Sequence, residues 1–297
     1  MSSRTLQIGV LLGSQLAIGS AALMARAGLE AGAGPLELAF WRLVVAWLTV
    51  VVVARLLPTP SAPVTGRDRW VAVAGGLFLG WHFALWFFSL GEISVALSTL
   101  LVCTSPIWAG LLEAVVLKRP PKPMFWLGVA TALAGVALVV GAERVGGGSN
   151  LLLGGLAAAA GAACLVPYLL AGKVLQRRYG LWRSVGWTYG LAGATLAPLL
   201  AMQGGWARLA PPGSTSVWLA VVGMALVPQM MGHTALNWSM RWFPASTVGL
   251  ATLLEPVFAA LLAWPLFGEP VRPLQAVGAA VLLIGVGLGI GAEERSG

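Results

Sequence analysis

The stretch that decides the fold occurs twice in the sequence. Residues 96–143 read ALSTLLVCTSPIWAGLLEAVVLKRPPKPMFWLGVATALAGVALVVGAE, and residues 246–293 read STVGLATLLEPVFAALLAWPLFGEPVRPLQAVGAAVLLIGVGLGIGAE. Aligned without a gap, these stretches are identical at 16 of 48 positions. Biased composition alone would produce some leucine and alanine matches, but the two copies also share three prolines and three glycines in register. The chain therefore contains an internal repeat with an offset of 150 residues.

The composition indicates that most of the chain lies in a lipid bilayer. Of the 297 residues, 58% are hydrophobic and only 9% are charged, whereas soluble domains carry about 25% charged residues. A soluble fold of this length could not bury so much apolar surface. A membrane helix, in contrast, needs a run of about 20 mostly apolar residues. We therefore expect an all-α membrane protein.

Turn residues and charges divide the chain into ten apolar stretches. We expect transmembrane helices at residues 6–26, 36–57, 70–90, 93–117, 124–141, 151–171, 182–202, 217–240, 246–267 and 274–291. The first stretch follows Arg4 and is similar to the apolar core of a signal peptide. We interpret it as an uncleaved helix, because its removal would leave the repeat incomplete. Residues 1–145 and 146–297 then contribute five helices each.

The odd number of helices in each half predicts that the second half is inverted relative to the first. After five crossings the chain has changed sides, so the second copy enters the membrane from the opposite face. The loops agree: Lys118–Pro123 reads KRPPKP and is basic, whereas Gly268–Pro273 reads GEPVRP and has no net charge. We expect two inverted five-helix repeats around a central cavity, an architecture that recurs in secondary transporters.

The basic residues indicate the orientation of the chain. If the N-terminus lies in the cytoplasm, the cytoplasmic loops and termini carry 13 of the 18 lysines and arginines, and the opposite loops carry four. Cytoplasmic loops of membrane proteins are enriched in these residues. We expect both termini in the cytoplasm and the chain in the cell's inner membrane. This loop bias explains the net charge of +8, so we expect contacts with lipid and no nucleic-acid partner.

Several motifs resemble those of one transporter family. They are Glu255–Leu262 (EPVFAALL), Gly268–Glu269, Gly278, Gly285 and, in the first half, Ser105–Trp108 (SPIW). With its length and repeat, the chain resembles the EamA-type exporters of the drug/metabolite transporter superfamily. The resemblance implies a ten-helix bundle around a central cavity, with helices five and ten at its periphery. It also implies export of amino acids, other metabolites or drug-like cations. The first half departs from the motif, with Lys118-Arg119 in place of Gly-Glu.

Two histidines, the only ones in the chain, occupy matching positions of the two halves. His82 lies in the third expected helix and His233 in the eighth, 151 residues apart. Side chains four residues apart share a helix face. The resulting stripes are Phe78, His82 and Trp86 in one helix and Gln229, His233 and Asn237 in the other. We expect an aromatic wall and an amide-rich wall that face each other across the cavity. The alternative is that each histidine only hydrogen-bonds a neighbouring helix.

Glu255 lies near the middle of the ninth expected helix and is followed by Pro256. A membrane carboxyl that is neutral in one state and ionised in another can couple proton movement to transport. The alternative is a structural ion pair with Arg42. Arg42 could also snorkel, pair with Glu37, or contact an anionic group of the substrate. Pro256 and its repeat mate Pro106 break their helices and free backbone carbonyls at this depth.

Ser105 and Trp108 complete the set of expected cavity residues. Both belong to the first-half segment that matches the Glu255 motif. A deep tryptophan usually packs between helices, but its ring can also contact aromatic or cationic solutes. We expect no metal and no cofactor, because Cys103 and Cys164 lie in apolar stretches and lack metal-site spacing.

Together these features predict a secondary active transporter. We expect it to export small organic solutes that are amino acid-like, amphiphilic or drug-like, by alternating access coupled to protons or to exchange. The alternatives are a facilitative channel or uniporter and a non-transporting membrane scaffold. An enzyme is not expected, because no apolar stretch contains an aspartate and the two histidines lack a catalytic set. Monomer and homodimer are both compatible with the sequence.

Overall fold

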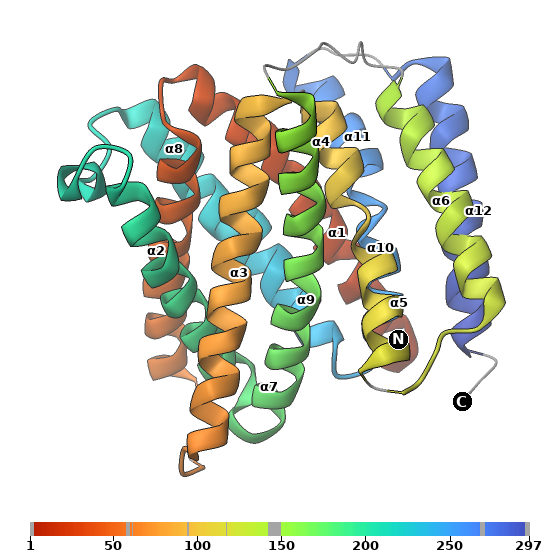
Figure 1. Cartoon of the computed structure of the whole chain (residues 1–297), viewed down its shortest axis with the longest axis horizontal. Coiled ribbons are helices and arrows are strands. Elements are labelled where there is room, and N and C mark those ends of the chain that lie inside the picture. Colours follow the sequence, from red (N-terminus) through yellow and green to blue (C-terminus); the bar gives the residue numbers. More distant parts are fainter. Residues whose placement is uncertain are drawn as a thin grey trace.

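The computed structural model describes residues 3–57, 60, 62–93, 95–116, 118–141, 150–267 and 271–294. Every regular element in these residues is a helix, and the helices stand side by side as a bundle (Figure 1). The boundary expected between residues 145 and 146 lies outside the described residues, as does the expected turn at residues 268–270.

Short connections join the helices. In chain order they are α1 (Ser3–Glu30), α2 (Pro35–Leu56), α3 (Gly66–Glu92), α4 (Val95–Val102), α5 (Ser105–Val115), α6 (Pro123–Gly141), α7 (Leu151–Ala201), the 3-10 helix η1 (Trp206–Leu209), α8 (Thr215–Met224), the π-helix η2 (Ala225–His233), α9 (Thr234–Ser239), α10 (Ala245–Thr252), α11 (Glu255–Phe267) and α12 (Pro273–Glu294). Within the described residues, eight helical stretches are long and apolar enough to cross a membrane, and Pro123–Val139 is a shorter apolar helix. The expected multi-pass, all-helical character is thus confirmed.

The sixth and seventh expected spans correspond to the two parts of α7, which are two helices that meet at a kink without a loop between them. The backbone of α7 is non-helical at Gly180 (φ 72°, ψ 173°). A straight helix of its 51 residues would be about 75 Å long, more than twice the bilayer's hydrocarbon thickness of about 30 Å. Glycine adopts a positive φ at no steric cost, and α7 folds back at the lower end of the bundle in Figure 1.

Two membrane stretches are interrupted at equivalent positions of the repeat. The first breaks at Cys103–Thr104, between α4 and α5, and the second at Leu253–Leu254, between α10 and α11. Pro106 and Pro256 are each the second residue of the helix that follows the break. Proline is tolerated in the first turn of a helix but not in its interior. A new helix therefore has to begin just ahead of each proline.

The two interrupted stretches run in opposite directions. In Figure 1, α4 and α5 descend, and the chain passes into α6 at the lower end of the bundle. In contrast, α10 and α11 ascend, and α12 begins at the upper end. α6 and α12 then lie side by side at one edge of the bundle.

Facing glycines allow α6 and α12 to pack closely. A carbon added as a side chain at Gly128 would lie 2.6 Å from the backbone nitrogen of Gly289, and one at Gly278 would lie 2.7 Å from that of Val139. Gly128 and Gly278 are repeat mates, so the same repeat position allows the close backbone approach in both helices. Small residues that permit close backbone approach are a common basis of helix association in membranes.

We predict that Gly128→Ala and Gly278→Ala each destabilise the protein by about 1–3 kcal/mol, because the added methyl group meets backbone atoms that have no alternative rotamer. Thermal unfolding of the purified protein in detergent measures this loss. Gly287→Ala in α12 is the matched control, since no atom lies within 4 Å of its added carbon. Equal melting temperatures for all three variants would contradict the packing.

Candidate functional site

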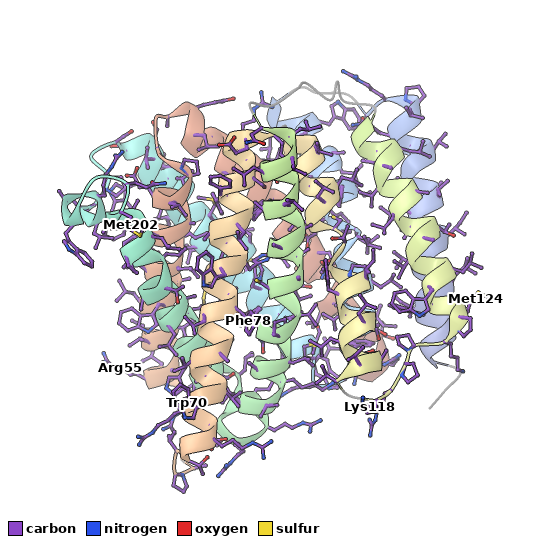
Figure 2. All side chains as sticks on the ribbon, viewed as in Figure 1. Arg55, Trp70, Phe78, Lys118, Met124 and Met202 are labelled. Atoms are coloured by element: carbon purple, nitrogen blue, oxygen red, sulfur yellow. The ribbon has the colours of Figure 1, made fainter. Side chains whose placement is uncertain are left out.

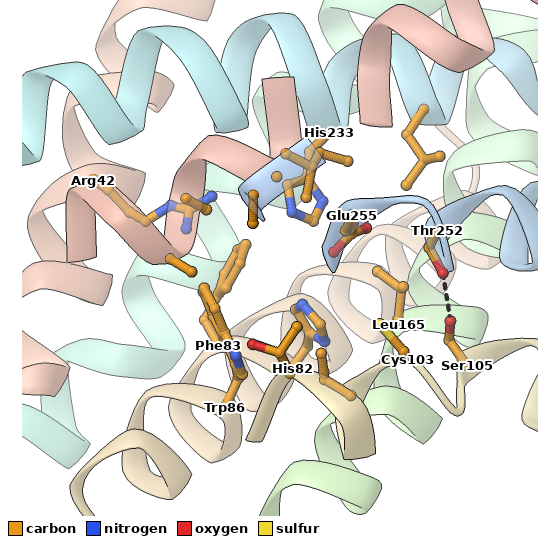
Figure 3. Close-up of a pocket in the computed structure, with 18 residues that line it drawn as sticks. Arg42, His82, Phe83, Trp86, Cys103, Ser105, Leu165, His233, Thr252 and Glu255 are labelled. Carbon is orange, nitrogen blue, oxygen red and sulfur yellow. Dashed lines mark hydrogen bonds between the residues drawn. The ribbon is translucent and has the colours of Figure 1, made fainter. Parts of the chain in front are cut away.

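The helices enclose a cavity beside the two interruptions (Figure 3). Its walls come from α1, α2, α3, α7, η2, α9 and both interrupted stretches. The polar and aromatic lining residues are Arg42, His82, Phe83, Trp86, Thr99, Cys103, Ser105, His233, Thr252 and Glu255. The cavity volume is about 50 Å³, which is room for a few water molecules.

His82 and His233 meet in this cavity. Their ring centroids lie 6.0 Å apart, with an angle of 64° between the ring planes. Nδ1 of His82 is 2.8 Å from the carbonyl oxygen of Gly161 in α7. A carbonyl only accepts, so this nitrogen carries the hydrogen and Nε2 remains an acceptor in the neutral ring. Nδ1 of His233 has no hydrogen-bond partner among the described residues. The imidazole of His82 is therefore held by a hydrogen bond, whereas Nδ1 of His233 is available to bind another group.

The π-helix η2 presents His233 to the cavity. Pro228 lies inside η2 and cannot donate the hydrogen bond that an α-helix requires at its position. Further along η2, the carbonyl of Gln229 accepts from the backbone N–H of Thr234, five residues on, and from the hydroxyl of Tyr189 at 3.3 Å. Single π-turns of this kind are frequent at functional sites.

Arg42 is enclosed by the bundle, with 0% of its surface exposed. Its Nη2 donates to Oε1 of Gln229 at 2.7 Å, and its guanidinium lies 4.3 Å above the centre of the Phe83 ring. Its Nε and Nη1 have no hydrogen-bond partner in the described part of the chain. Because a guanidinium keeps its charge in proteins, a cation held by a neutral amide and an aromatic ring borders the cavity.

The ion pairs considered for Arg42 are replaced by other contacts. Gln229 takes the place of a carboxylate partner. Oε2 of Glu37 accepts from the backbone N–H of Gly34 at 3.1 Å and so caps α2. Glu255 borders the same cavity as Arg42, and Figure 3 shows the two side chains well separated, on either side of His233.

Ser105 and Glu255 are repeat mates, and each is the first residue of the helix that follows an interruption. The hydroxyl oxygen of Ser105 lies 2.8 Å from that of Thr252, the last residue of α10. This hydrogen bond connects the two interrupted stretches (Figure 3). The carboxyl of Glu255 is at the N-terminus of α11, where unpaired backbone N–H groups favour negative charge.

The structure brings six of the residues expected at the site to this cavity. They are Arg42, His82, Trp86, Ser105, His233 and Glu255. Sequence reasoning did not single out Phe83, Thr252 or Tyr189. Only sequence proximity could have pointed to two of them, because Phe83 directly follows His82 and Thr252 lies three residues before Glu255.

Four other expected residues are not among those that line the cavity. Phe78 is 40% exposed and Trp108 38% exposed, so both lie on outer faces. A step of four residues rotates a helix position by about 40°, and the stripe through His82 consequently drifts outward by Phe78. The amides bind within the protein: Gln229 accepts from Arg42, and Asn237 Oδ1 accepts from Gln176 at 3.4 Å.

The chemistry of this cavity is suited to reversible binding. It combines one cation, one carboxyl, two imidazoles, hydroxyl groups and two aromatic rings. Among the residues that the structure describes, no three His, Cys, Asp or Glu side chains are placed to hold a metal ion. A largely apolar cavity with a few charged and polar groups, placed between interrupted helices of a membrane bundle, is typical of membrane carriers.

The chain belongs to the EamA-like transporter family, which matches residues 5–141 and again residues 152–290. It is accordingly a member of a transporter family and not an enzyme. The family expected from the sequence motifs is confirmed.

Curated relatives agree with this assignment, and a solved structure shares the fold. The "Uncharacterized transporter YdfC" of Bacillus subtilis is 28% identical over 291 residues, which cover 96% of this chain and 92% of that protein. The "Probable terminal-alkyne amino-acid exporter" of Streptantibioticus cattleyicolor is 28% identical over 268 residues, or 88% of this chain and 85% of that protein. A crystal structure with 20% sequence identity superposes on 99% of this chain and 100% of that chain with a TM-score of 0.77, which shows the fold.

We predict that Ser105→Ala and Thr252→Val lower stability non-additively. Each removes the hydrogen bond between the two hydroxyls, worth about 1 kcal/mol, and Thr252→Val also removes the bond that its hydroxyl donates to Gly249 O at 2.7 Å. The double variant should therefore lose about as much as Thr252→Val alone. Unfolding of the purified variants measures the cycle. Thr131→Val is the control partner, because the Thr131 hydroxyl bonds within its own helix to Leu127 O at 2.8 Å and should add independently to Ser105→Ala. Additive losses for Ser105 and Thr252 would refute the link.

Proposed function

We propose that this protein is a secondary transporter that exports small organic metabolites across the inner membrane by alternating access. The substrates are amino acid-like, amphiphilic or drug-like solutes. The observation that carries the proposal is a single cavity lined by both halves of the chain, with His82 and Ser105 from the first half and His233 and Glu255 from the second. A relative whose name describes an amino-acid exporter supports the direction of transport.

The proposed architecture has ten spanning helices in two inverted halves, residues 1–145 and 146–297. The count of ten spans treats α7 as two spans that meet at Gly180. It treats each interrupted stretch as one span, and α8, η2 and α9 together as one span. The separate family matches to residues 5–141 and 152–290 support two equivalent halves. The opposite directions of the interrupted stretches in Figure 1 support their inversion.

Both termini are proposed to face the cytoplasm. In Figure 1, α1 begins and α12 ends toward the lower end of the bundle. Figure 2 places Arg55 and Lys118 toward this same end. Because basic residues collect on the cytoplasmic side of membrane proteins, the lower end is the cytoplasmic one in this proposal.

Alternating access explains the small size of the cavity. A volume of about 50 Å³ is well below the ~300–1,000 Å³ of typical ligand sites. A substrate of several heavy atoms enters only if helices separate, and a carrier separates them on one side at a time. The interruptions in both halves offer hinge points beside the cavity, where a few backbone angles can absorb the movement.

Glu255 is the proposed coupling group. It is the only carboxyl among the residues that line the described cavity. A membrane carboxyl that faces each side in turn can take up a proton on one side and release it on the other. Exchange of one solute for another is the alternative coupling, and it needs no titrating group.

We predict saturable counterflow in proteoliposomes. A thermal-shift screen of the purified protein against amino acids, nucleosides and organic cations selects the solute, because a bound ligand stabilises the folded state. Uptake of that labelled solute should saturate with concentration and accelerate when the same unlabelled solute is inside. A linear flux without acceleration would indicate a channel, and no flux for any stabilising solute would indicate a scaffold.

We predict that Glu255→Gln abolishes the response of transport to an imposed pH gradient but retains solute exchange, since glutamine has a similar shape and cannot carry the proton. The initial rate of uptake with and without the gradient measures this loss. Glu37→Gln is the control, because an amide can still cap α2 at this position and the residue is not among those lining the cavity. An undiminished gradient response in Glu255→Gln would exclude the coupling role.

A further inference from the structure

We infer that the cavity contains an anion subsite at Arg42 and His233, and that the transported solutes carry a carboxylate that binds there. This inference rests on the proposed transport function and narrows its substrate class. Among the solutes considered, it favours amino acid-like and other acidic metabolites over cationic drug-like compounds.

Unpartnered nitrogen atoms cluster in the wall of the cavity. Nε and Nη1 of Arg42, Nδ1 of His233 and Nε1 of Trp86 lack a hydrogen-bond partner among the described residues. All three residues line the cavity and are at most 8% exposed. Buried polar groups are normally satisfied, and each one left unpaired costs about 1–3 kcal/mol. Several such groups around one cavity indicate that something else supplies the acceptor.

The charge of the wall identifies the acceptor as an anion. An arginine inside a membrane bundle ordinarily pairs with a carboxylate or with backbone carbonyls. Here the partners of Arg42 are the neutral side-chain amide of Gln229 at 2.7 Å and the ring of Phe83 at 4.3 Å. Among the described residues no carboxylate forms an ion pair with this guanidinium, and a substrate carboxylate would provide the countercharge.

The contacts of Arg42 leave part of its guanidinium available for a further hydrogen-bond acceptor. The guanidinium carbon lies over the Phe83 ring, and Gln229 accepts a hydrogen bond from one guanidinium nitrogen, Nη2. Arginine has five N–H donors in a fixed fork that matches the two oxygens of a carboxylate. The Phe83 ring also lies 5.2 Å from the His233 ring, so one aromatic side chain positions both donors of the subsite.

Glu255 makes the other end of the cavity unsuitable for an anion. In Figure 3 His233 lies between Arg42 and Glu255. A solute with its carboxylate at Arg42 would therefore place its remaining part near a second, acidic group. This polarity predicts one binding orientation, with the carboxylate directed toward α2.

The decisive test compares acids with their amides on the intact protein. Purified chain in nanodiscs is titrated with L-leucine, L-phenylalanine, L-methionine and hexanoate, and with the primary amide of each, while thermal unfolding is recorded. We expect the acids that stabilise the protein to bind at least about tenfold more tightly than their amides, a difference of about 1.4 kcal/mol. Amides that bind as well as their acids, or a panel without a single acid-selective compound, would overturn the subsite.

Variants of Arg42 test whether this residue causes the preference for acids over amides. Arg42→Gln should reduce the acid-to-amide ratio to within about twofold, and Arg42→Lys should retain part of it, because the charge remains without the planar fork. If Arg42→Gln does not fold, Arg42→Lys and the wild-type comparison still decide. Arg26→Gln is the matched arginine control, since Arg26 lies on the surface in an ion pair with Glu30 at 2.9 Å. A ratio unchanged in both Arg42 variants would overturn the assignment.

Failure of this inference differs from failure of the proposed transport function. Saturable counterflow of amides or amines with no preference for acids would remove the anion subsite and leave the carrier intact. Absence of counterflow for every solute that stabilises the protein would count against the carrier itself.

Discussion

Two interruptions of membrane helices determine where polar chemistry can exist in this protein. Backbone N–H and C=O groups in a bilayer have to be satisfied within the protein, so a span can break only where other helices or a cavity cover the break. The breaks at Cys103–Thr104 and Leu253–Leu254 meet this condition by flanking the same cavity, where the hydroxyls of Ser105 and Thr252 join them. The cavity thus lies where the two repeat prolines, Pro106 and Pro256, force the helices to break.

The π-helix η2 adds the second constraint, because it sets the direction of two side chains at once. The wide turn places His233 on the cavity wall and brings Gln229 to the guanidinium of Arg42. Arg42 is thereby held by a neutral hydrogen-bond acceptor, which does not neutralise its charge. The first half of the chain contributes the Arg42 cation. The second half contributes the neutral Gln229 amide, which leaves this cation available to a ligand. A site shared in this way can change its exposure when the halves move relative to each other.

Much of the fold was predictable because its signals are local in the sequence. Apolar length indicated the spans, and the in-register Pro106 and Pro256 indicated the interruptions. The site was predictable only in part, because side-chain direction depends on the twist of each helix and on its neighbours. Phe78 lies outside because four residues exceed one helical turn. Gln229 does not line the cavity as expected, because the π-turn directs its side chain to Arg42. No spacing in the sequence reveals this partner.

The account depends most on the antiparallel placement of the repeated segments, and cysteine labelling tests it directly. Lys122 and Arg272 are repeat mates, and both are exposed at the start of their outer helices. Each is replaced by cysteine in a chain that lacks Cys103 and Cys164, and a membrane-impermeant maleimide is added to right-side-out and inverted membrane vesicles. The account predicts that Lys122→Cys reacts only in inverted vesicles and Arg272→Cys only in right-side-out vesicles. Reaction of both cysteines from the same side would contradict the inverted architecture and the shared cavity built on it.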